Sequence, residues 1–154
     1  MTVEAVIALG ANLGDPVRTI TQALRDLADL PETEVLGVSS LYRTAPHQAT
    51  GPDFINAVAR VTTRLSPYGL LLALQAQEQR AGRERPYPNA PRTLDLDLIF
   101  HGDAAIHTPD LTLPHPRWRE RAFVLVPLAE IWPERVPALD LQAVQQHQVI
   151  EKLP

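Results

Sequence analysis

The sequence of 154 residues contains no cysteine and only one lysine, and each absence excludes a class of chemistry. Without cysteine, the chain can form no disulfide, use no thiol nucleophile and bind neither zinc nor an iron–sulfur cluster through thiolates. The single lysine, Lys152, lies close to the C-terminal end. A Walker phosphate loop requires Gly-Lys-Ser/Thr and a Schiff-base enzyme requires a buried lysine, so the sequence excludes both.

The sequence also has no long hydrophobic run and no excess of positive charge. No apolar stretch approaches the ~20 residues that span a bilayer, and the N-terminus has no basic stretch followed by an apolar core. The formal net charge is −4, whereas general nucleic-acid binders are usually basic. We therefore expect a cytoplasmic, monomeric protein that forms one domain over residues 1–154 and has neither a membrane nor a nucleic-acid partner.

Proline is abundant, with 15 residues, and it separates the apolar segments of the chain. Asp15-Pro16 and Ser66-Pro67 each combine a helix N-cap residue with a first-turn proline. These pairs predict helices that run from there to Pro31 and to Gly82. Apolar segments with the pattern of strands occupy residues 3–10, 33–42, 54–63 and 93–100.

The order strand, helix, strand, strand, helix, strand predicts a fold of the α+β class. It is the ferredoxin-like βαββαβ arrangement, an antiparallel sheet with helices packed on one face, here followed by a C-terminal extension. In that extension we expect a short helix between Arg119 and Ile131, which Pro127 breaks or ends.

The segment from Arg92 to Phe100 carries two acidic residues in a strand pattern. Alternate side chains of a strand share a face, so four apolar side chains are expected to enter the core together: Leu94, Leu96, Leu98 and Phe100. Asp95 and Asp97 then point outward, with Cα atoms about 6.6 Å apart, and repel each other by about 3 kcal/mol. Such a pair suits Mg²⁺, which takes one or two carboxylates together with substrate phosphates. The alternative is a solvated strand face whose aspartates only prevent edge aggregation.

Several arginines precede this strand in the sequence: Arg80, Arg83, Arg85 and Arg92. Guanidinium groups bind phosphate through two hydrogen bonds and keep their charge. Arginines beside two carboxylates therefore predict a site for a complex of a metal with a polyphosphate. Taken alone, the arginines are more typical of a solvated, flexible loop.

An aromatic residue and an amide share a face of the predicted strand 54–63. Phe54 and Asn56 alternate there, so a ring that can stack a flat heterocycle lies beside an amide that can bind its edge. A core phenylalanine and a turn-capping asparagine are the alternative. Phe123 is a candidate for the opposite side of such a sandwich, and His115, between two prolines, is either a ligand-binding or an ordinary surface histidine.

Six short motifs together carry a family resemblance. In chain order they are residues 8–14 (ALGANLG), 40–46 (SLYRTAP), 54–57 (FINA), 82–83 (GR), 91–97 (PRTLDLD) and 113–116 (LPHP). Over about residues 3–132 the chain resembles the 6-hydroxymethyl-7,8-dihydropterin pyrophosphokinases, also called 2-amino-4-hydroxy-6-hydroxymethyldihydropteridine diphosphokinases. The motif at 91–97 is the most specific of the six.

The resemblance implies an ATP- and Mg²⁺-dependent diphosphokinase of folate biosynthesis, which transfers diphosphate from ATP to the pterin hydroxymethyl group and releases AMP. It implies that Asp95 and Asp97 hold two Mg²⁺ ions and act in catalysis together with Arg83 and Arg92. The ATP-binding residues that it implies are Glu78, Arg83, Arg85, Arg92, Leu98, Thr112, His115 and Arg121. The pterin-binding residues that it implies are Thr44, Ala45, Pro46, His47, Phe54, Asn56 and Phe123.

Two other functions are considered beside this one. A ferredoxin-like domain could bind only a ligand or partner, and Mg²⁺-dependent release of AMP distinguishes it from the enzyme. A polymerase- or nuclease-like palm domain also uses paired aspartates and two metal ions. The acidic net charge and small size disfavour the palm domain, which tight, salt-dependent DNA binding would support.

Overall fold

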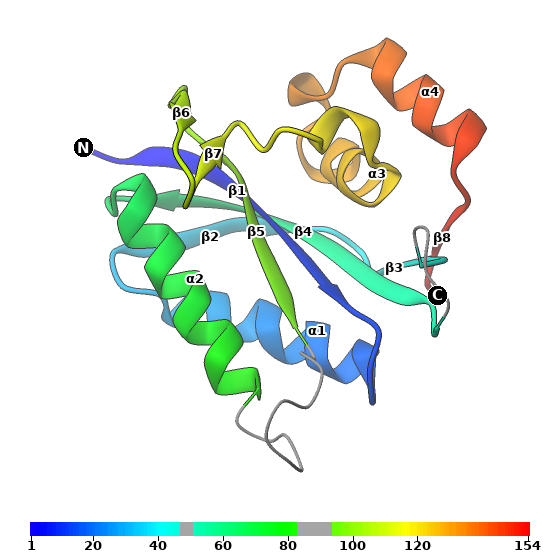
Figure 1. Cartoon of the computed structure of the whole chain (residues 1–154), viewed down its shortest axis with the longest axis horizontal. Helices are drawn as coiled ribbons and strands as arrows, with labels where there is room; N and C mark the ends of the chain where they lie inside the picture. Colours follow the sequence, from blue (N-terminus) through cyan, green and yellow to red (C-terminus); the bar gives the residue numbers. More distant parts are fainter. Residues whose placement is uncertain (47–50, 83–93) are drawn as a thin grey trace.

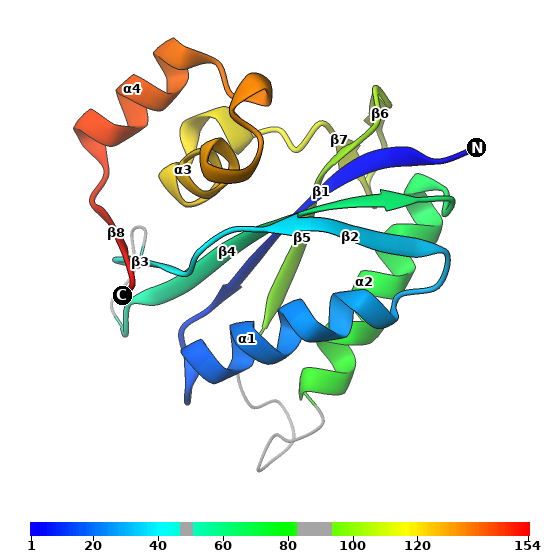
Figure 2. The ribbon, with the colours of Figure 1, turned by 180° about the vertical axis from the view of Figure 1, so that it is seen from behind.

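The computed structural model describes residues 1–46, 51–82 and 94–154 of the chain, which form a sheet with helices on both sides (Figures 1 and 2). The strands are β1 (Val3–Ala11), β2 (Thr33–Val38), β3 (Tyr42–Thr44), β4 (Phe54–Thr63), β5 (Asp95–His101), β6 (Ile106–His107), β7 (Thr112–Leu113) and β8 (Ile150–Lys152). The α-helices are α1 (Pro16–Asp26), α2 (Pro67–Gly82), α3 (Ala122–Ile131) and α4 (Ala138–His147). Short 3₁₀ helices occupy Leu27–Asp29, Trp118–Glu120 and Pro133–Arg135.

The main sheet has the order β5-β1-β4-β3-β8, and β2 also pairs with β4. Each of these pairings is antiparallel. With β1 and β4 at the centre and α1 and α2 as the crossover helices, this is the predicted ferredoxin-like βαββαβ arrangement. Strands β6 and β7 pair with each other in a separate hairpin.

Helices α1 and α2 begin where the sequence predicts. The Asp15 carboxylate accepts a hydrogen bond from the backbone N–H of Arg18 (3.2 Å), and Ser66 Oγ accepts one from the N–H of Gly69 (3.0 Å). Both helices pack on the same face of the sheet through buried side chains, which include Ile20, Ala23, Leu70 and Leu74. Within the described part of the chain, no helix is long and apolar enough to cross a membrane.

The opposite face of the sheet is covered as well, by the C-terminal extension. Leu125 and Leu128 of α3 and Val144 of α4 join a second buried cluster, which contains Val58 and Phe100 of the sheet. Figures 1 and 2 show α3 and α4 on the side of the sheet that α1 and α2 leave open. The prediction that helices pack on one face is therefore correct for α1 and α2 only.

Helix α3 continues through Pro127 to Ile131, so the predicted break at this proline is wrong. Pro127 has no N–H and therefore removes one hydrogen bond from the helix. The residue is buried, as are Leu125 and Leu128 on either side of it. Packing of this apolar helix against the sheet offsets the missing hydrogen bond.

The segment 33–42, predicted as one strand, contains β2 and the first residue of β3, two separate strands that both pair with β4. At Ser39, the backbone N–H still donates to the carbonyl of Val58 (2.8 Å), but the N–H of Val58 donates to Ser39 Oγ (2.9 Å). At Ser40, the backbone N–H and Oγ donate instead to the carboxylate of Glu130 in α3, at 2.9–3.1 Å. Side chains thus take over part of the hydrogen bonding at the break between β2 and β3.

Strand β5 contains an extra residue opposite β1. Val6 pairs with Phe100 and Ile7 with Leu98, so Ile99 forms a bulge. Because of the bulge, Ile99 and Phe100 both pack on the α3 face, whereas the leucines of the strand pack against α1 and α2. The prediction that Phe100 shares the leucines' side is wrong, since strict alternation ends at this bulge.

Candidate active site

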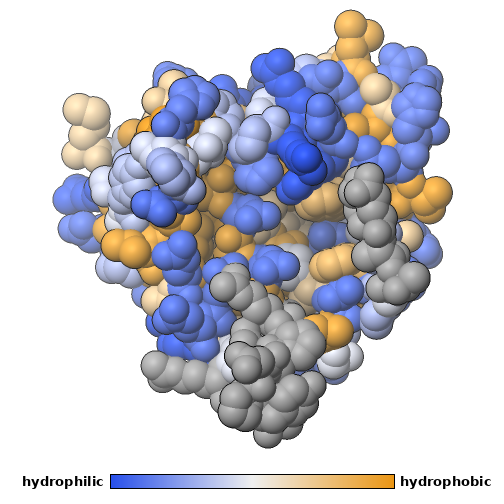
Figure 3. All heavy atoms as spheres, viewed as in Figure 1, coloured by the Kyte–Doolittle hydropathy of each residue, from blue (hydrophilic) through white to orange (hydrophobic). Residues whose placement is uncertain are grey.

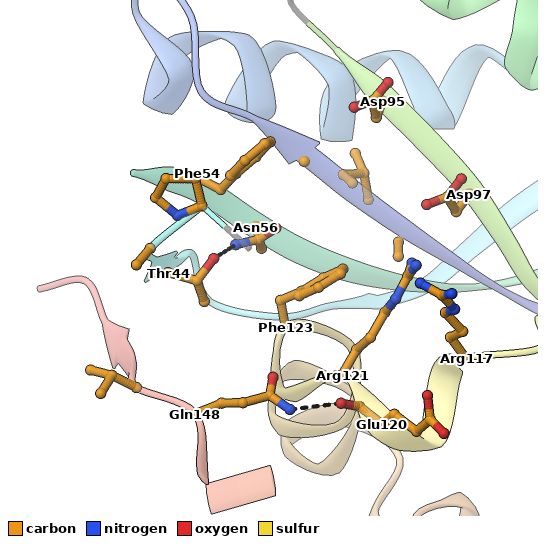
Figure 4. A pocket seen from close by; sticks show the side chains of 16 residues that line it. Thr44, Phe54, Asn56, Asp95, Asp97, Arg117, Glu120, Arg121, Phe123 and Gln148 are labelled. Atoms are coloured by element: carbon orange, nitrogen blue, oxygen red, sulfur yellow. Dashed lines mark hydrogen bonds between the residues drawn. The ribbon is translucent and has the colours of Figure 1, made fainter. Parts of the chain in front are cut away.

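A pocket of about 720 Å³ opens on the α3 face of the sheet, next to the second buried cluster (Figures 3 and 4). Its walls come from β1, β3, β4 and β5, from the start of α3 and from the residues just before β8. The lining residues are Ala8, Leu9, Gly10, Thr44, Ala45, Pro46, Phe54, Asn56, Asp95, Asp97, Arg117, Glu120, Arg121, Phe123, Gln148 and Val149.

The floor of the pocket is formed by small residues of β1. Val6 packs in the buried cluster on the α3 face, and the next residues in alternation, Ala8 and Gly10, line the pocket. A Cβ atom on Gly10 would lie 3.3 Å from Asn56 Oδ1 and 4.0 Å from Phe54 Cδ1. Glycine at this position therefore leaves space that a side chain would take from a ligand.

The two aspartates of β5 lie beside this floor. Asp95 is opposite Gly10 and Asp97 is opposite Ala8 in the β1–β5 ladder, so both carboxylates face the pocket (Figure 4). Their hard oxygen atoms suit Mg²⁺. No group of three or more His, Cys, Asp or Glu side chains able to hold a metal occurs in the described ranges. A Mg²⁺ ion held by this pair would therefore complete its shell with oxygen atoms of a ligand or of water.

Positive side chains lie on the opposite wall. Arg117 and Arg121 come from the segment between β7 and α3, and in Figure 4 both guanidinium groups point towards Asp97. A pocket with carboxylates on one wall and guanidinium groups on the other suits a phosphorylated ligand that carries a divalent cation.

His115 lies next to this charged part of the pocket. Its backbone N–H donates to the carbonyl of Ile99 (2.9 Å), and its Nδ1 accepts a hydrogen bond from the N–H of Arg117 (3.2 Å). Burial lowers the pKa of His115 below its usual value of 6.5, and the charges of Arg121 and Arg117 act in the same direction against that of Asp97. This shift favours the neutral imidazole, in which a hydrogen bond accepted at Nδ1 leaves the proton on Nε2.

The other end of the pocket is aromatic. Phe54 begins β4 and Phe123 belongs to α3, and Figure 4 shows Asn56 between them at the back of the pocket. The Asn56 side chain is buried, and its Nδ2 donates to Thr44 Oγ1 (2.8 Å), which fixes the orientation of the amide. The Arg121 guanidinium carbon lies 5.3 Å from the centre of the Phe123 ring. Two rings and a fixed amide are the groups expected around a flat heterocycle.

The pocket brings together many of the predicted site residues, namely Thr44, Ala45, Pro46, Phe54, Asn56, Asp95, Asp97, Arg121 and Phe123. The side chain of Leu98 instead packs in the core against α1 and α2. Glu78 accepts a hydrogen bond from the N–H of Leu96 (2.8 Å), and Thr112 pairs with His107. Four further predictions lie outside the described residues: His47, Arg83, Arg85 and Arg92.

Seven residues that line the pocket are not among the predicted site residues: Ala8, Leu9, Gly10, Arg117, Glu120, Gln148 and Val149. Arg117 and Glu120 are charged and lie between the predicted site residues His115 and Arg121, which makes them candidates from the sequence. Gln148 and Val149 follow α4 and carry no local signal, because only the three-dimensional fold brings them to the pocket.

Solved structures define the class of fold. The structure of Plasmodium falciparum HPPK-DHPS wild type with pteroate matches with a TM-score of 0.73 and 14% identity, over 96% of this chain and 44% of that one. The present chain therefore spans less than half the length of that chain. The match agrees with the topology of the sheet, and the protein is a ferredoxin-like α+β domain.

Sequence comparison gives the family. The sequence model of 7,8-dihydro-6-hydroxymethylpterin-pyrophosphokinase (HPPK) matches residues 6–133. The 2-amino-4-hydroxy-6-hydroxymethyldihydropteridine pyrophosphokinase of Pseudomonas aeruginosa is 42% identical over 160 residues, which cover 100% of this chain and 99% of that protein. A protein of the same name from Synechocystis is 46% identical over 132 residues, which cover 86% of this chain and 68% of that protein. The chain belongs to the HPPK family.

Proposed function

We propose that this protein transfers diphosphate from ATP to the hydroxymethyl group of 6-hydroxymethyl-7,8-dihydropterin, as a step of folate biosynthesis. The pterin hydroxyl oxygen attacks the β-phosphorus of ATP, the bond from that phosphorus to the α,β-bridging oxygen breaks, and AMP leaves with this oxygen. The hydroxyl proton passes to solvent. The observation that carries the proposal is one pocket with two carboxylates at one end and two aromatic rings at the other.

The aromatic end is proposed to bind the pterin. Phe54 and Phe123 stack on its two faces, and Asn56 binds its polar edge. The hydrogen bond from Asn56 Nδ2 to Thr44 Oγ1 leaves Oδ1 directed towards Gly10, where it can accept a hydrogen bond from a ring N–H. The backbone of residues 44–47 completes this end of the pocket in the proposal.

The carboxylate end is proposed to receive the triphosphate. Asp95 and Asp97 would hold two Mg²⁺ ions, which neutralise phosphate charge and lower the barrier to attack at phosphorus when they are bound. The carboxylates then keep the phosphate chain on the side of the pocket that faces the pterin hydroxyl. Attack at phosphorus requires this positioning more than covalent help from the protein, which accords with a chain that lacks cysteine.

Cationic and neutral donors are proposed to bind the phosphate oxygens from the other wall. Arg121 supplies a permanent charge, and the neutral His115 supplies its Nε2–H. From the sequence we assign Arg83, Arg85 and Arg92 to the same task, with Arg83 and Arg92 at the transferred group. Glu78, Leu98 and Thr112 are assigned to ATP, with Leu98 contributing backbone atoms because its side chain is buried. From the sequence, the enzyme is proposed to act as a monomer in the cytoplasm.

The test is an assay of the purified protein with ATP, Mg²⁺ and the hydroxymethyl pterin, in which both nucleotide and pterin products are separated by chromatography. We expect AMP and pterin diphosphate in equal amounts, and no AMP when the pterin is omitted or EDTA is added. Formation of ADP would indicate transfer of a single phosphate. Binding of both ligands without any product would instead support a domain that only binds.

A further inference from the structure

The chain continues beyond the part that the family model matches. The match ends at residue 133, while α4 and β8 follow it. Strand β8 pairs with β3 in the order Thr44–Ile150 to Tyr42–Lys152, so the tail is built into the edge of the main sheet. Figure 1 shows this last segment, in red, running from α4 down to β3.

Two residues between α4 and β8 reach the pocket. Val149 lies at its rim with an exposed side chain, whereas Gln148 is half-buried. The Gln148 backbone is itself held, because its N–H donates to the carbonyl of Val144 at the end of α4 (2.9 Å). The two residues of the tail that line the pocket are therefore held at both ends, by α4 before them and by β8 after them.

The side-chain amide of Gln148 bonds to the backbone on both sides of Arg121. Its Nε2 donates to the carbonyl of Glu120 (2.7 Å), and its Oε1 accepts from the N–H of Ala122 (3.0 Å). Figure 4 shows the first of these bonds at the lower edge of the pocket. One amide thus holds two successive peptide groups, as a neighbouring strand would.

This contact lies where two pocket side chains originate. Arg121 is the N-cap residue of α3, and its own side chain makes no capping hydrogen bond. The Ala122 N–H is one of the first four of the helix, which have no partner within the helix. Gln148 supplies that partner, and the next residue, Phe123, projects its ring into the pocket.

We propose that Gln148 is a positioning residue, which fixes the start of α3 so that Phe123 and Arg121 keep their orientation towards the substrates. The inference rests on the proposed function, and it assigns to the C-terminal tail a part in binding the pterin. Gln148 itself touches neither substrate in this proposal. Its effect passes through the backbone of residues 120–122 to the ring of Phe123.

The proposal predicts a selective loss in Gln148→Ala. This variant loses both hydrogen bonds, so the start of α3 should shift. We therefore expect the KM for the pterin to rise about tenfold. The KM for ATP should rise less than that for the pterin, because Arg121 is only one of the groups assigned to the phosphates and the carboxylate wall does not depend on this contact. Gln146→Ala is the matched control, since Gln146 is an exposed glutamine of α4 two residues away.

Gln148→Glu separates positioning from simple stabilisation of the helix. A carboxylate at this place still accepts the hydrogen bond from the Ala122 N–H, and its charge stabilises a helix N-terminus. The thermal unfolding midpoint of Gln148→Glu should therefore equal that of the wild type. It has no donor for the Glu120 carbonyl, so the KM for the pterin should stay raised. Direct titration of the pterin in the presence of a non-hydrolysable ATP analogue measures the same change without turnover.

The outcomes distinguish this inference from the proposed function. A wild-type protein that forms no AMP from ATP and the pterin contradicts the proposed function itself. An active wild type with an unchanged pterin KM in Gln148→Ala contradicts only the positioning role, as does Gln148→Glu if it restores both the melting temperature and the pterin KM. A raised pterin KM in both variants, with normal values for Gln146→Ala, supports it.

Discussion

The two faces of the sheet use the same strands in different ways. On the α1/α2 face, apolar side chains of β1 such as Ile7 and Leu9 pack against the helices along the strand. On the α3 face, an apolar cluster occupies one part of the sheet and the pocket another. The difference follows from side-chain size and charge, because the backbone of both faces is one continuous ladder.

Successive rows across the sheet show how the pocket arises. The row of Val6 pairs with Phe100 and belongs to the apolar cluster on the α3 face. In the next two rows, Ala8 lies opposite Asp97 and Gly10 lies opposite Asp95. Residues of β1 therefore become smaller towards the pocket while those of β5 become charged. Substitutions in the pocket on the α3 face should accordingly affect activity, and substitutions on the α1/α2 face should affect stability.

The largest effect is expected on the pocket face, from Asp97→Ala. Loss of one of the two carboxylates should lower kcat by about 10³-fold or more, since the charge of the phosphate chain is no longer balanced. The fold should be retained, because Asp97 is half-buried at the pocket and belongs to neither buried apolar cluster. Steady-state kinetics and circular dichroism measure the two quantities, with the exposed Asp103→Ala as the control. Near-normal turnover in Asp97→Ala would remove this carboxylate from the mechanism.

The opposite face should show the reverse pattern in Leu98→Ala. The Leu98 side chain is 4% exposed, so its truncation should reduce the free energy of unfolding by about 2–4 kcal/mol. Under conditions where the variant is folded, its kcat and KM for ATP should match the wild type. Denaturant titration gives the stability, and Leu36→Ala, at an exposed leucine of β2, should cost about 0.5 kcal/mol or less. A raised KM for ATP in folded Leu98→Ala would mean that this side chain does contact the nucleotide.

The floor of the pocket is tested by Gly10→Ala. The added Cβ would lie 3.3 Å from Asn56 Oδ1, so it should displace the amide or the ligand and weaken pterin binding about tenfold. Gly37→Ala in β2 is the matched control, because a Cβ there meets no atom within 4 Å. Titration with the pterin measures both variants. Equal affinities for the two would show that the space above Gly10 is not used.

The smallest effect concerns how α3 is attached to the sheet. Tyr42 OH donates to Glu130 (2.6 Å), and burial together with this carboxylate raises the pKa of Tyr42. Burial acts to raise the pKa of Glu130, but hydrogen bonds from Tyr42 and Ser40 and the charge of Lys152 outweigh it, so this pKa is lowered. The stabilisation is therefore present above the unfolded-state pKa of Glu130 and is lost as pH falls through the folded-state value.

Tyr42→Phe should consequently cost about 1 kcal/mol at pH 7, since Glu130 is partly solvated, and less in acid. Denaturant titration at pH 7 and at acidic pH measures the difference. Tyr68→Phe is the control, because the hydrogen bond of Tyr68 OH among the described residues is with a hydroxyl, Thr108 Oγ1. A cost for Tyr42→Phe that does not vary with pH would show that the charge of Glu130 contributes nothing.

Much of the fold could be predicted because its signals are local. Asp15-Pro16 and Ser66-Pro67 specify the helix starts through contacts within three residues, and both caps are confirmed. The break of the segment 33–42 could not be predicted in this way. It depends on Glu130, which lies 90 residues from Ser40 in the sequence and comes to it only through the packing of α3.

The candidate site shows the same division. The shared face of Asp95 and Asp97 follows from strand alternation and is confirmed. Alternation fails at Phe100, because the bulge at Ile99 arises from packing on both faces. Gln148 was beyond prediction, since an isolated glutamine after a helix has no pattern that distinguishes it from its neighbours. The roles of the site residues in binding and catalysis stay predictions until they are measured.

The bulge at Ile99 has a consequence for how this protein tolerates insertions and deletions. The bulge divides β5 into two halves, one with the aspartates and one that ends at His101. Each half pairs with β1 in its own register. A change in length of the hairpin that follows His101 need not shift the aspartates along β1. Removal of Ile99 itself would keep the pairs Ile7–Leu98 and Val6–Phe100 and restore strict alternation. Removal of a residue between Asp95 and Leu98 would instead turn over one half of the strand, which would bury a carboxylate or expose the core. Insertions and deletions among natural variants should therefore occur after this bulge more often than before it.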